Sequence, residues 1–485
     1  MINDTAAPLR AGRTLRLSQA AIAFYLLTGT AWLIIASLFW WLNTAQAFAP
    51  NARYAFAGVP WLTYGRVWPA FTNTFVFGWA SLTGLGVALY FVSRLSRLSW
   101  RAGVMILTAG IIWNLSLVLG LWHVLGGGST GRELLEINPS ISFGFFLSAV
   151  LLVTWLLVEF WAYRNELRFI PLWYLFAALL CFVWVFTTGQ TIVNYWHTGG
   201  ATQPAIQSWY VNGLFHLWLV PLALGAAYVL IPEGVQRPVN SLALARIGFW
   251  GYGALAVWVG LLSFLGGPFP AWMQTVTIVA NVLLILPVLA LFANFHCTLN
   301  GRYDFAGPNL PLRFATTGFF LFVAATFWSA FASFRTVDYI FHFTLGMAAR
   351  WSLLLTGFVT FTLMGAVYYA LPRLLDRNWL NPGIIRLQFW LAATGVGLLT
   401  LDQVVGGLIQ GYGLADAKID FSAVVDIIRP FLLVQFIAVG ILVFSYLLFG
   451  LSLLLMLCFR YSERTRAAAA EPVAPVETPA EVSVA

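Results

Sequence analysis

Five histidines are the residues of this chain best suited to bind a metal ion, because neutral imidazole is the commonest metal ligand in proteins. They are His123, His197, His216, His296 and His342. Four of them lie at the ends of long apolar segments, where we expect polar residues of a membrane interface. The exception is His216, which lies inside such a segment.

His216 follows Asn212 by four residues, so the two side chains share one face of a helix, with His216 about 6 Å deeper. An ionisable residue inside an apolar segment is a functional candidate. We expect a neutral histidine that hydrogen-bonds to a neighbouring helix. The alternative is a relocated metal ligand, although the sequence offers it no obvious partner. Asp402 and Arg350 are the other main charges inside apolar segments, and they either line an ion path or pair with neighbours.

The composition places these residues in a membrane. Of 485 residues, 61% are hydrophobic and 9% are charged, whereas soluble domains carry about 25% charged residues. The net charge of +8 comes from arginines clustered between apolar segments, which is a topology signal and does not indicate nucleic-acid binding. The three cysteines have no spacing typical of a disulfide framework or a metal site.

Twelve segments are long and apolar enough to cross a bilayer, which takes about 20 helical residues each. Because backbone amides must be satisfied internally in lipid, every one should be a helix, and the fold class is an all-α, polytopic twelve-helix bundle. The segments are roughly 19–43, 69–93, 102–125, 141–163, 170–193, 208–232, 245–266, 272–295, 313–334, 343–371, 385–411 and 427–458. The bundle occupies 19–460, between an N-terminal cytoplasmic arm (1–18) and a cytoplasmic tail (461–485) whose composition predicts disorder.

The basic residues favour an orientation with both termini in the cytoplasm. With twelve spans, the cytoplasmic loops and tails hold 18 of the 25 lysines and arginines, and only seven lie elsewhere. Those seven are Arg53, Arg66, Arg132, Arg335, Arg350, Lys418 and Arg429.

Several segments, between about residues 60 and 450, resemble the catalytic subunit of haem–copper oxidases, in particular the cbb3-type cytochrome c oxidase. The matching segments are YGRVWPAFTN (64–73), GGSTGRELLEI (127–137), SWYVNGLFHLWLVPLALGAAYVLIP (208–232), WVGLLSFLGGPFPAWMQT (258–275), FTLGMAARW (343–351) and FWLAATGVGLLTLDQVVGGLIQGY (389–412). Their order and spacing agree with that family. The resemblance implies a bacterial inner-membrane protein of the respiratory chain that would hold haem b and copper.

In that family six histidines hold two haems and a copper ion, and the resemblance places none of them here. The low-spin haem ligands would be Phe71 and Ala349, and the high-spin haem ligand would be Met347. The copper ligands would be Asn212, Leu262 and Ser263. Phe, Leu and Ala offer no lone pair, and Asn and Ser are poor copper ligands. We therefore expect no catalytic residue, no bound haem and no copper, with His216 and Met347 as the remaining cofactor-ligand candidates.

The resemblance also implies a calcium site in the loop 127–137, where Glu133 or Glu136 could supply carboxylate oxygens. The alternative, which we favour, is that these glutamates pair with Arg132 or cap helix ends.

The expected function is that of a non-catalytic structural or regulatory subunit of a respiratory complex. Its partners would be the bilayer and other subunits, such as a membrane-anchored c-type cytochrome. Two rivals remain: an active oxidase or nitric oxide reductase relative with unusual ligation, and an ion or proton transporter that reuses the bundle.

Overall fold

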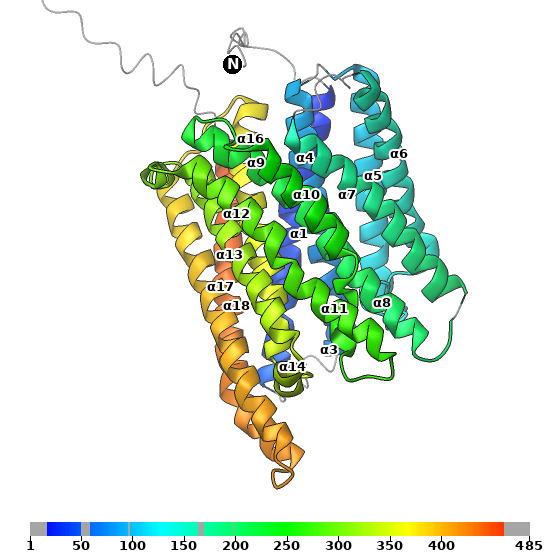
Figure 1. The fold of residues 1–485 in the computed structure, drawn as a ribbon. Coiled ribbons are helices and arrows are strands. Elements are labelled where there is room, and N and C mark those ends of the chain that lie inside the picture. Colours follow the sequence, from blue (N-terminus) through cyan, green and yellow to red (C-terminus); the bar gives the residue numbers. More distant parts are fainter. Residues whose placement is uncertain (1–16, 50–58, 96–97, 163–168, 197, 460–485) are drawn as a thin grey trace, which may run out of the picture.

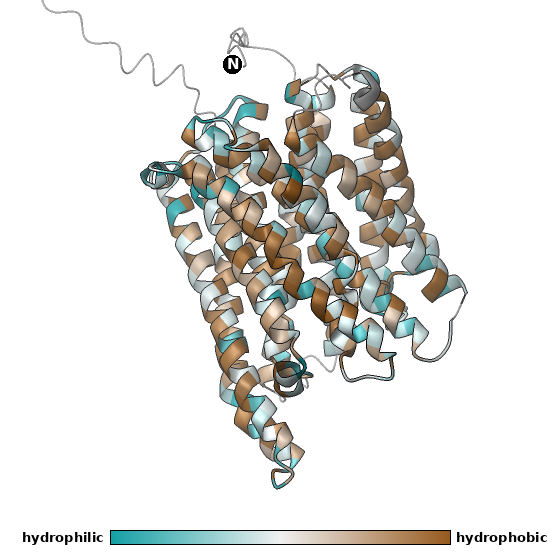
Figure 2. Ribbon diagram, viewed as in Figure 1, coloured by the Kyte–Doolittle hydropathy of each residue, from teal (hydrophilic) through white to brown (hydrophobic). Residues whose placement is uncertain are grey.

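The computed structural model describes residues 17–49, 59–95, 98–162, 169–196 and 198–459, and these form helices and connecting loops without a β-strand. Twelve helical spans in this described part are long and apolar enough to cross a membrane, which confirms the predicted all-α bundle (Figure 1). The predicted N-terminal arm and C-terminal tail lie almost wholly outside the described residues. Hydrophobic residues dominate the middle of the bundle and hydrophilic residues gather at its two ends (Figure 2).

Several spans are built from more than one helical segment. In chain order the spans are α1 (Leu17–Phe48); α3, η2 and α4 (Tyr64–Asn73, Thr74–Ala80, Ser81–Leu95); α5 (Trp100–Leu125); α6 (Pro139–Ala162); α7 and η4 (Ile170–Gly189, Gln190–Tyr195); α8, η5 and α9 (Thr202–Gly213, Leu214–Leu219, Val220–Val235); α10 and η6 (Leu242–Ala256, Val259–Phe264); α11 and α12 (Ala271–Leu283, Ile285–Leu299); α13 (Leu310–Ala332); α15, η8 and α16 (Gly346–Trp351, Ser352–Val359, Thr360–Leu375); α17 (Pro382–Ala415); and α18 (Phe421–Cys458). Short helices η1 (Pro60–Leu62), η7 (Tyr303–Ala306) and α14 (Arg335–Phe341) lie in the connections.

Spans two, six and ten form the core of the bundle, since nearly every residue along their apolar stretches is buried. Each of these three spans widens into a π-helical segment, namely η2, η5 and η8. Such segments are rare and frequently mark functional sites. Here η2 begins three residues after Phe71, η5 contains His216, and η8 begins two residues after Arg350. The three spans therefore bring most of the candidate site residues to the centre.

We define the inner end of the bundle by the connection 376–381 and the outer end by the connection 416–420. Arginines gather at the inner end, among them Arg94, Arg101, Arg237, Arg246, Arg302, Arg313, Arg373, Arg377 and Arg386. This distribution agrees with the predicted orientation. The placement of both termini in the cytoplasm stays a prediction.

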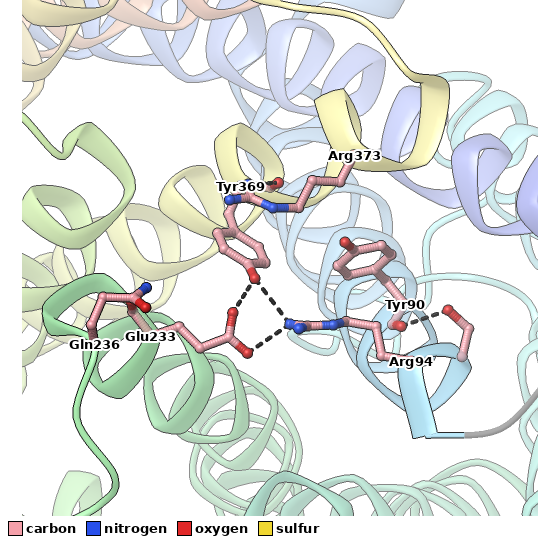
Figure 3. A network of polar contacts seen from close by, with 7 residues as sticks. Tyr90, Arg94, Glu233, Gln236, Tyr369 and Arg373 are labelled. Carbon is pink, nitrogen blue, oxygen red and sulfur yellow. Dashed lines mark hydrogen bonds and ion pairs between the residues drawn. The ribbon is translucent and has the colours of Figure 1, made fainter. Parts of the chain in front are cut away.

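The three core spans are tied together at the inner end by a polar cluster of Arg94 on α4, Glu233 on α9, and Tyr369 and Arg373 on α16 (Figure 3). Arg94 Nη1 lies 2.6 Å from Glu233 Oε1 and donates to the Tyr369 hydroxyl at 2.9 Å. Tyr369 donates in turn to the second oxygen of Glu233, and the Arg373 guanidinium lies 3.8 Å from the centre of the Tyr369 ring. This cluster links spans two, six and ten through side-chain contacts at the inner end.

The last two spans are longer than a bilayer requires. At about 1.5 Å per residue, the 34 residues of α17 and the 38 of α18 reach roughly 50 to 57 Å, compared with a hydrocarbon core of about 30 Å. Their outer ends project beyond the other helices as a helical hairpin (Figure 1). Hydropathy predicted both spans but placed the end of the first at 411 and the start of the second at 427. The hairpin's outer turns were therefore missed.

Candidate functional site

Phe71 lies where the resemblance predicts a haem ligand, and it packs in a group of aromatic rings. Its ring stacks on Trp40 of α1, with ring centres 5.1 Å apart and planes 9° apart. Trp68 and Phe75 approach from the same span, with ring centres at 5.6 and 5.8 Å. Aromatic side chains, which have no lone pair for iron, therefore occupy this place.

Met347 and Ala349 lie on α15 at the outer end of span ten. Ala349 is completely buried, whereas Met347 is half-buried. Glycines allow α15 to lie close against α17: a Cβ atom added at Gly407 would come within 2.2 Å of the Gly346 backbone nitrogen. Ala349 has no donor atom in its side chain.

Asn212 is buried on α8, and its side chain satisfies backbone carbonyls. Its Nδ2 donates to Ser208 at 2.8 Å and to Gly260 at 3.3 Å. Leu262 is buried beside this region on η6, and Ser263 follows it at a half-buried position. The three predicted copper positions thus come from spans six and seven, as the resemblance predicts. An amide, an isobutyl group and a hydroxyl stand there.

Arg350 of α15 reaches this same region, which the sequence did not predict. Its side chain is 6% exposed, and its Nη2 donates to Ser263 Oγ at 3.0 Å. The guanidinium also lies 4.4 Å from the ring centre of Trp351. No carboxylate of the described residues lies within 4.0 Å of it. A permanent positive charge therefore stands directly beside a position where the resemblance places a copper ligand.

His216 lies on η5 and contacts the neighbouring span seven. Its Nδ1 is 2.7 Å from the hydroxyl of Tyr252 on α10, and the two rings are tilted by 38°. This is the contact that a neutral, hydrogen-bonded histidine requires. The role of His216 as a relocated ligand stays a prediction, as does that of Met347.

A small cavity separates spans six, seven, eight, nine and ten at this level. Its volume, counted as the space open to the centre of a water molecule, is about 20 Å³. A single buried water needs roughly 10–15 Å³, so the cavity has room for one small molecule or ion and is far too small for a haem. Its polar lining consists of Asn212, His216, Asn281, Thr326, Ser329 and Arg350.

Taken as a donor set, the six predicted positions do not suit haem iron or copper. They offer one thioether, one amide and one hydroxyl, and no imidazole. Within the described residues, no group of three or more His, Cys, Asp or Glu side chains is arranged to hold a metal ion.

The loop between α5 and α6 places its two glutamates differently. Glu136 is 3% exposed, and its Oε2 accepts a hydrogen bond from Asn73 Nδ2 at 2.8 Å. Burial raises the pKa of Glu136 to about 7, although the Asn73 hydrogen bond opposes this shift. Glu133 is exposed. A calcium ion held by these two residues stays a prediction.

Arg132 of the same loop contacts span five. Its Nη1 donates to the Val193 carbonyl at 3.0 Å and to Asn194 Oδ1 at 2.7 Å. No ion pair between Arg132 and Glu133 or Glu136 occurs in the described structure. The expected pairing of Arg132 with these glutamates is therefore absent from it.

Asp402 lies on α17 and is 6% exposed. Its Oδ2 has no hydrogen-bond partner among the described residues. It does not line the cavity beside Arg350. The two charges that the sequence singled out inside the membrane are therefore not paired with each other.

The remaining histidines occupy the ends of spans. His123 lies at the end of α5, His296 bonds to Tyr303 at 2.5 Å, and His342 pairs with Asp338 at 3.0 Å. His197 lies outside the described residues. Sequence reasoning also missed Tyr252, a polar residue inside the apolar segment 245–266 that turned out to be the partner of His216.

Comparison with solved structures identifies the class to which this bundle belongs. A heme-copper terminal oxidase dimer solved by cryo-EM superposes with a TM-score of 0.73 at 14% sequence identity, covering 90% of this chain and 84% of that chain. The fold is therefore that of haem–copper oxidase subunit I.

The family follows from the sequence match. Residues 20–441 match the family model of cytochrome c and quinol oxidase polypeptide I, and the chain belongs to this family. It is 24% identical to the cbb3-type cytochrome c oxidase subunit CcoN1 of Stutzerimonas stutzeri over 73% of this chain and 76% of that protein. It is 26% identical to cytochrome c oxidase subunit 1 of Rhodobacter capsulatus over 79% of this chain and 74% of that protein.

Proposed function

We propose that this cbb3-type subunit I-like protein is a non-catalytic member of its family and serves as a structural or regulatory subunit of a respiratory complex. The proposal includes location in a bacterial inner membrane, with both termini in the cytoplasm. The observation that carries it is the hydrogen bond from Arg350 to Ser263, at a position where the resemblance places a copper ligand.

The electrostatics of this contact disfavour a bound metal cation. Two unit charges 4 Å apart repel by about 4 kcal/mol at an effective dielectric constant of 20, and a divalent ion doubles that cost. An arginine cannot relieve the repulsion by losing its proton under physiological conditions. The guanidinium thus opposes a metal cation at this place, in addition to the poor donor set.

The proposed partners are other membrane subunits, such as a membrane-anchored c-type cytochrome. Two observations support this part of the proposal. The relatives are named as subunits of cytochrome c oxidases, and the described residues of this chain form twelve helical spans long and apolar enough to cross a membrane. A family member without catalytic groups would act through its surfaces, by binding other subunits.

Oxygen and nitric oxide consumption by the purified protein, alone and with its co-purifying subunits, tests the non-catalytic role. An oxidase containing the Rhodobacter capsulatus subunit 1 relative is the positive control. We expect no consumption of either gas that scales with the amount of this chain. Consumption that scales with this chain in the absence of any other haem protein contradicts the proposal and favours an enzyme with unusual ligation.

Ion transport is the second candidate function, favoured only by the unsatisfied, buried oxygen of Asp402. Proton or cation flux into proteoliposomes that falls in Asp402→Asn, and not in the exposed control Asp426→Asn on α18, supports transport. Equal flux in the wild type, both variants and protein-free liposomes eliminates it.

A further inference from the structure

Arg350 and the small cavity beside it form a polar chamber whose positive charge has no counter-ion in direct contact among the described residues. The carboxylates of Glu133 and Asp338 act on this charge from further away. The guanidinium is 6% exposed and has no carboxylate within 4.0 Å in the described structure. The Trp351 ring face and the Ser263 hydroxyl are its contacts. A buried charge is ordinarily paired, because desolvation without a partner is costly.

Hydrogen-bond donors remain available around this cavity. Arginine has five N–H groups, and Arg350 Nε is buried without a partner among the described residues. Asn281 uses one N–H on the Thr277 carbonyl at 2.9 Å, and its Oδ1 accepts from Ser329 at 2.9 Å. The second N–H of its amide is left over.

His216 supplies a further N–H donor, because its contact with the Tyr252 hydroxyl assigns the tautomer of the ring. When the Tyr252 hydroxyl donates its proton to Nδ1, the neutral ring carries its own proton on Nε2. His216, Asn281 and Arg350 all line the cavity. The chamber thus combines one full positive charge with neutral N–H donors.

We propose that this chamber binds one small monovalent anion of chloride size. The cavity, with its volume of about 20 Å³, has room for a monatomic ion. It is too small for phosphate, a carboxylate or haem. The anion gives Arg350 a counter-ion in direct contact and accepts hydrogen bonds from the unused N–H groups. In this arrangement the protein carries a guanidinium–halide pair in place of the metal chemistry that the family resemblance places here.

The inference rests on the proposed function in one respect, because a haem or copper ion would take the same space. Equilibrium binding of ³⁶Cl⁻ to the purified full-length protein tests it, in gluconate buffer at constant ionic strength. Haem content is measured on the same sample. A haem-free protein that binds no chloride contradicts this inference alone, whereas a haem-loaded protein contradicts the proposed function.

Two variants and a control define the site. Arg350→Gln removes the charge, and Ala325→Leu fills the cavity while keeping the guanidinium. Arg429→Gln removes an exposed cation from α18 and serves as the matched control. We expect one saturable, bromide-displaceable chloride per wild-type chain, affinity lower by about tenfold or more in both cavity variants, and no change in the control.

Size-exclusion profile and circular dichroism establish that each variant is folded. If Arg350→Gln does not fold, the Ala325→Leu variant decides the question by itself. The proposal is overturned if the folded wild type binds no saturable chloride, so that the cavity holds water only. It is equally overturned if a folded cavity variant binds chloride as tightly as the wild type.

Discussion

Arg350 Nη2 donates to Ser263 Oγ at 3.0 Å across 87 residues of sequence, and this bond joins span ten to span seven at the centre of the candidate site. Both residues follow positions that the resemblance assigns to metal chemistry: Arg350 comes directly after Ala349, and Ser263 directly after Leu262. A charged side chain therefore bridges two spans where the family resemblance places haem and copper.

The Arg350–Ser263 bond should contribute measurably to stability. Removing a hydrogen-bond partner of a buried charge costs about 1.5–3 kcal/mol, so we expect Ser263→Ala to lower the unfolding free energy in detergent by that amount. Ser422→Ala, at an exposed position on α18, is the control and should change stability by about 0.5 kcal/mol or less. Equal stability of the two variants would show that the bond contributes nothing.

Glu136 predicts a specific pH dependence of stability. Burial raises its pKa from 4.5 to about 7, so between these values the folded protein binds more protons than the unfolded chain. Stability then falls as pH rises from about 4.5 to 7, by roughly 3 kcal/mol at most. In Glu136→Gln this loss should disappear.

The measurement for Glu136 is the thermal midpoint of wild type and Glu136→Gln in detergent across that pH range. The variant should gain stability relative to wild type as pH rises. Asp426→Asn, at an exposed position on α18, should follow the wild-type curve. Parallel curves for wild type and Glu136→Gln would mean that folding does not shift the pKa of Glu136.

Phe71 should act as a packing residue. Its ring stacks on Trp40 and contacts Phe75. Truncating a buried phenylalanine to alanine costs about 3–5 kcal/mol, and a partly buried one costs less. We therefore expect Phe71→Ala to lose about 2–3 kcal/mol of unfolding free energy, compared with little change for Phe421→Ala, whose side chain is 72% exposed. No loss of stability in Phe71→Ala would refute the packing role.

A substitution at His216 tests whether this residue is a structural histidine or a cofactor ligand. If its function is the hydrogen bond to Tyr252, His216→Gln keeps a polar side chain able to bond there and should leave folding and the absorption spectrum nearly unchanged. Tyr252→Phe is the matched variant, because it removes the other side of the same bond. Disappearance of a visible absorption band in His216→Gln alone would identify His216 as a cofactor ligand.

Much of the architecture was predictable from sequence because lipid forces each apolar stretch into a helix. The twelve spans follow from this requirement. The outer turns of α17 and α18 do not, because residues such as Ala415 and Phe421 leave the membrane while continuing the helix. Hydropathy identifies the residues that lie in lipid. It does not predict how far a helix continues beyond the bilayer.

The candidate site was predictable only in part. The resemblance placed Asn212 and Ser263 together, and the structure brings their spans side by side. The contacts of Arg350 and His216 were not predictable, because Ser263 and Tyr252 lie on other spans, 87 and 36 residues away. Periodicity assigns a residue to a helix face, whereas the partner across that face depends on how the helices pack.

The central claim is that this chain holds neither haem nor copper. The most direct measurement is a pyridine haemochrome assay together with copper analysis on protein purified from a haem- and copper-replete host. Purification of the Rhodobacter capsulatus relative from the same host is the control. The account predicts haem and copper far below one per chain. A red preparation with two haems and one copper per chain would contradict it.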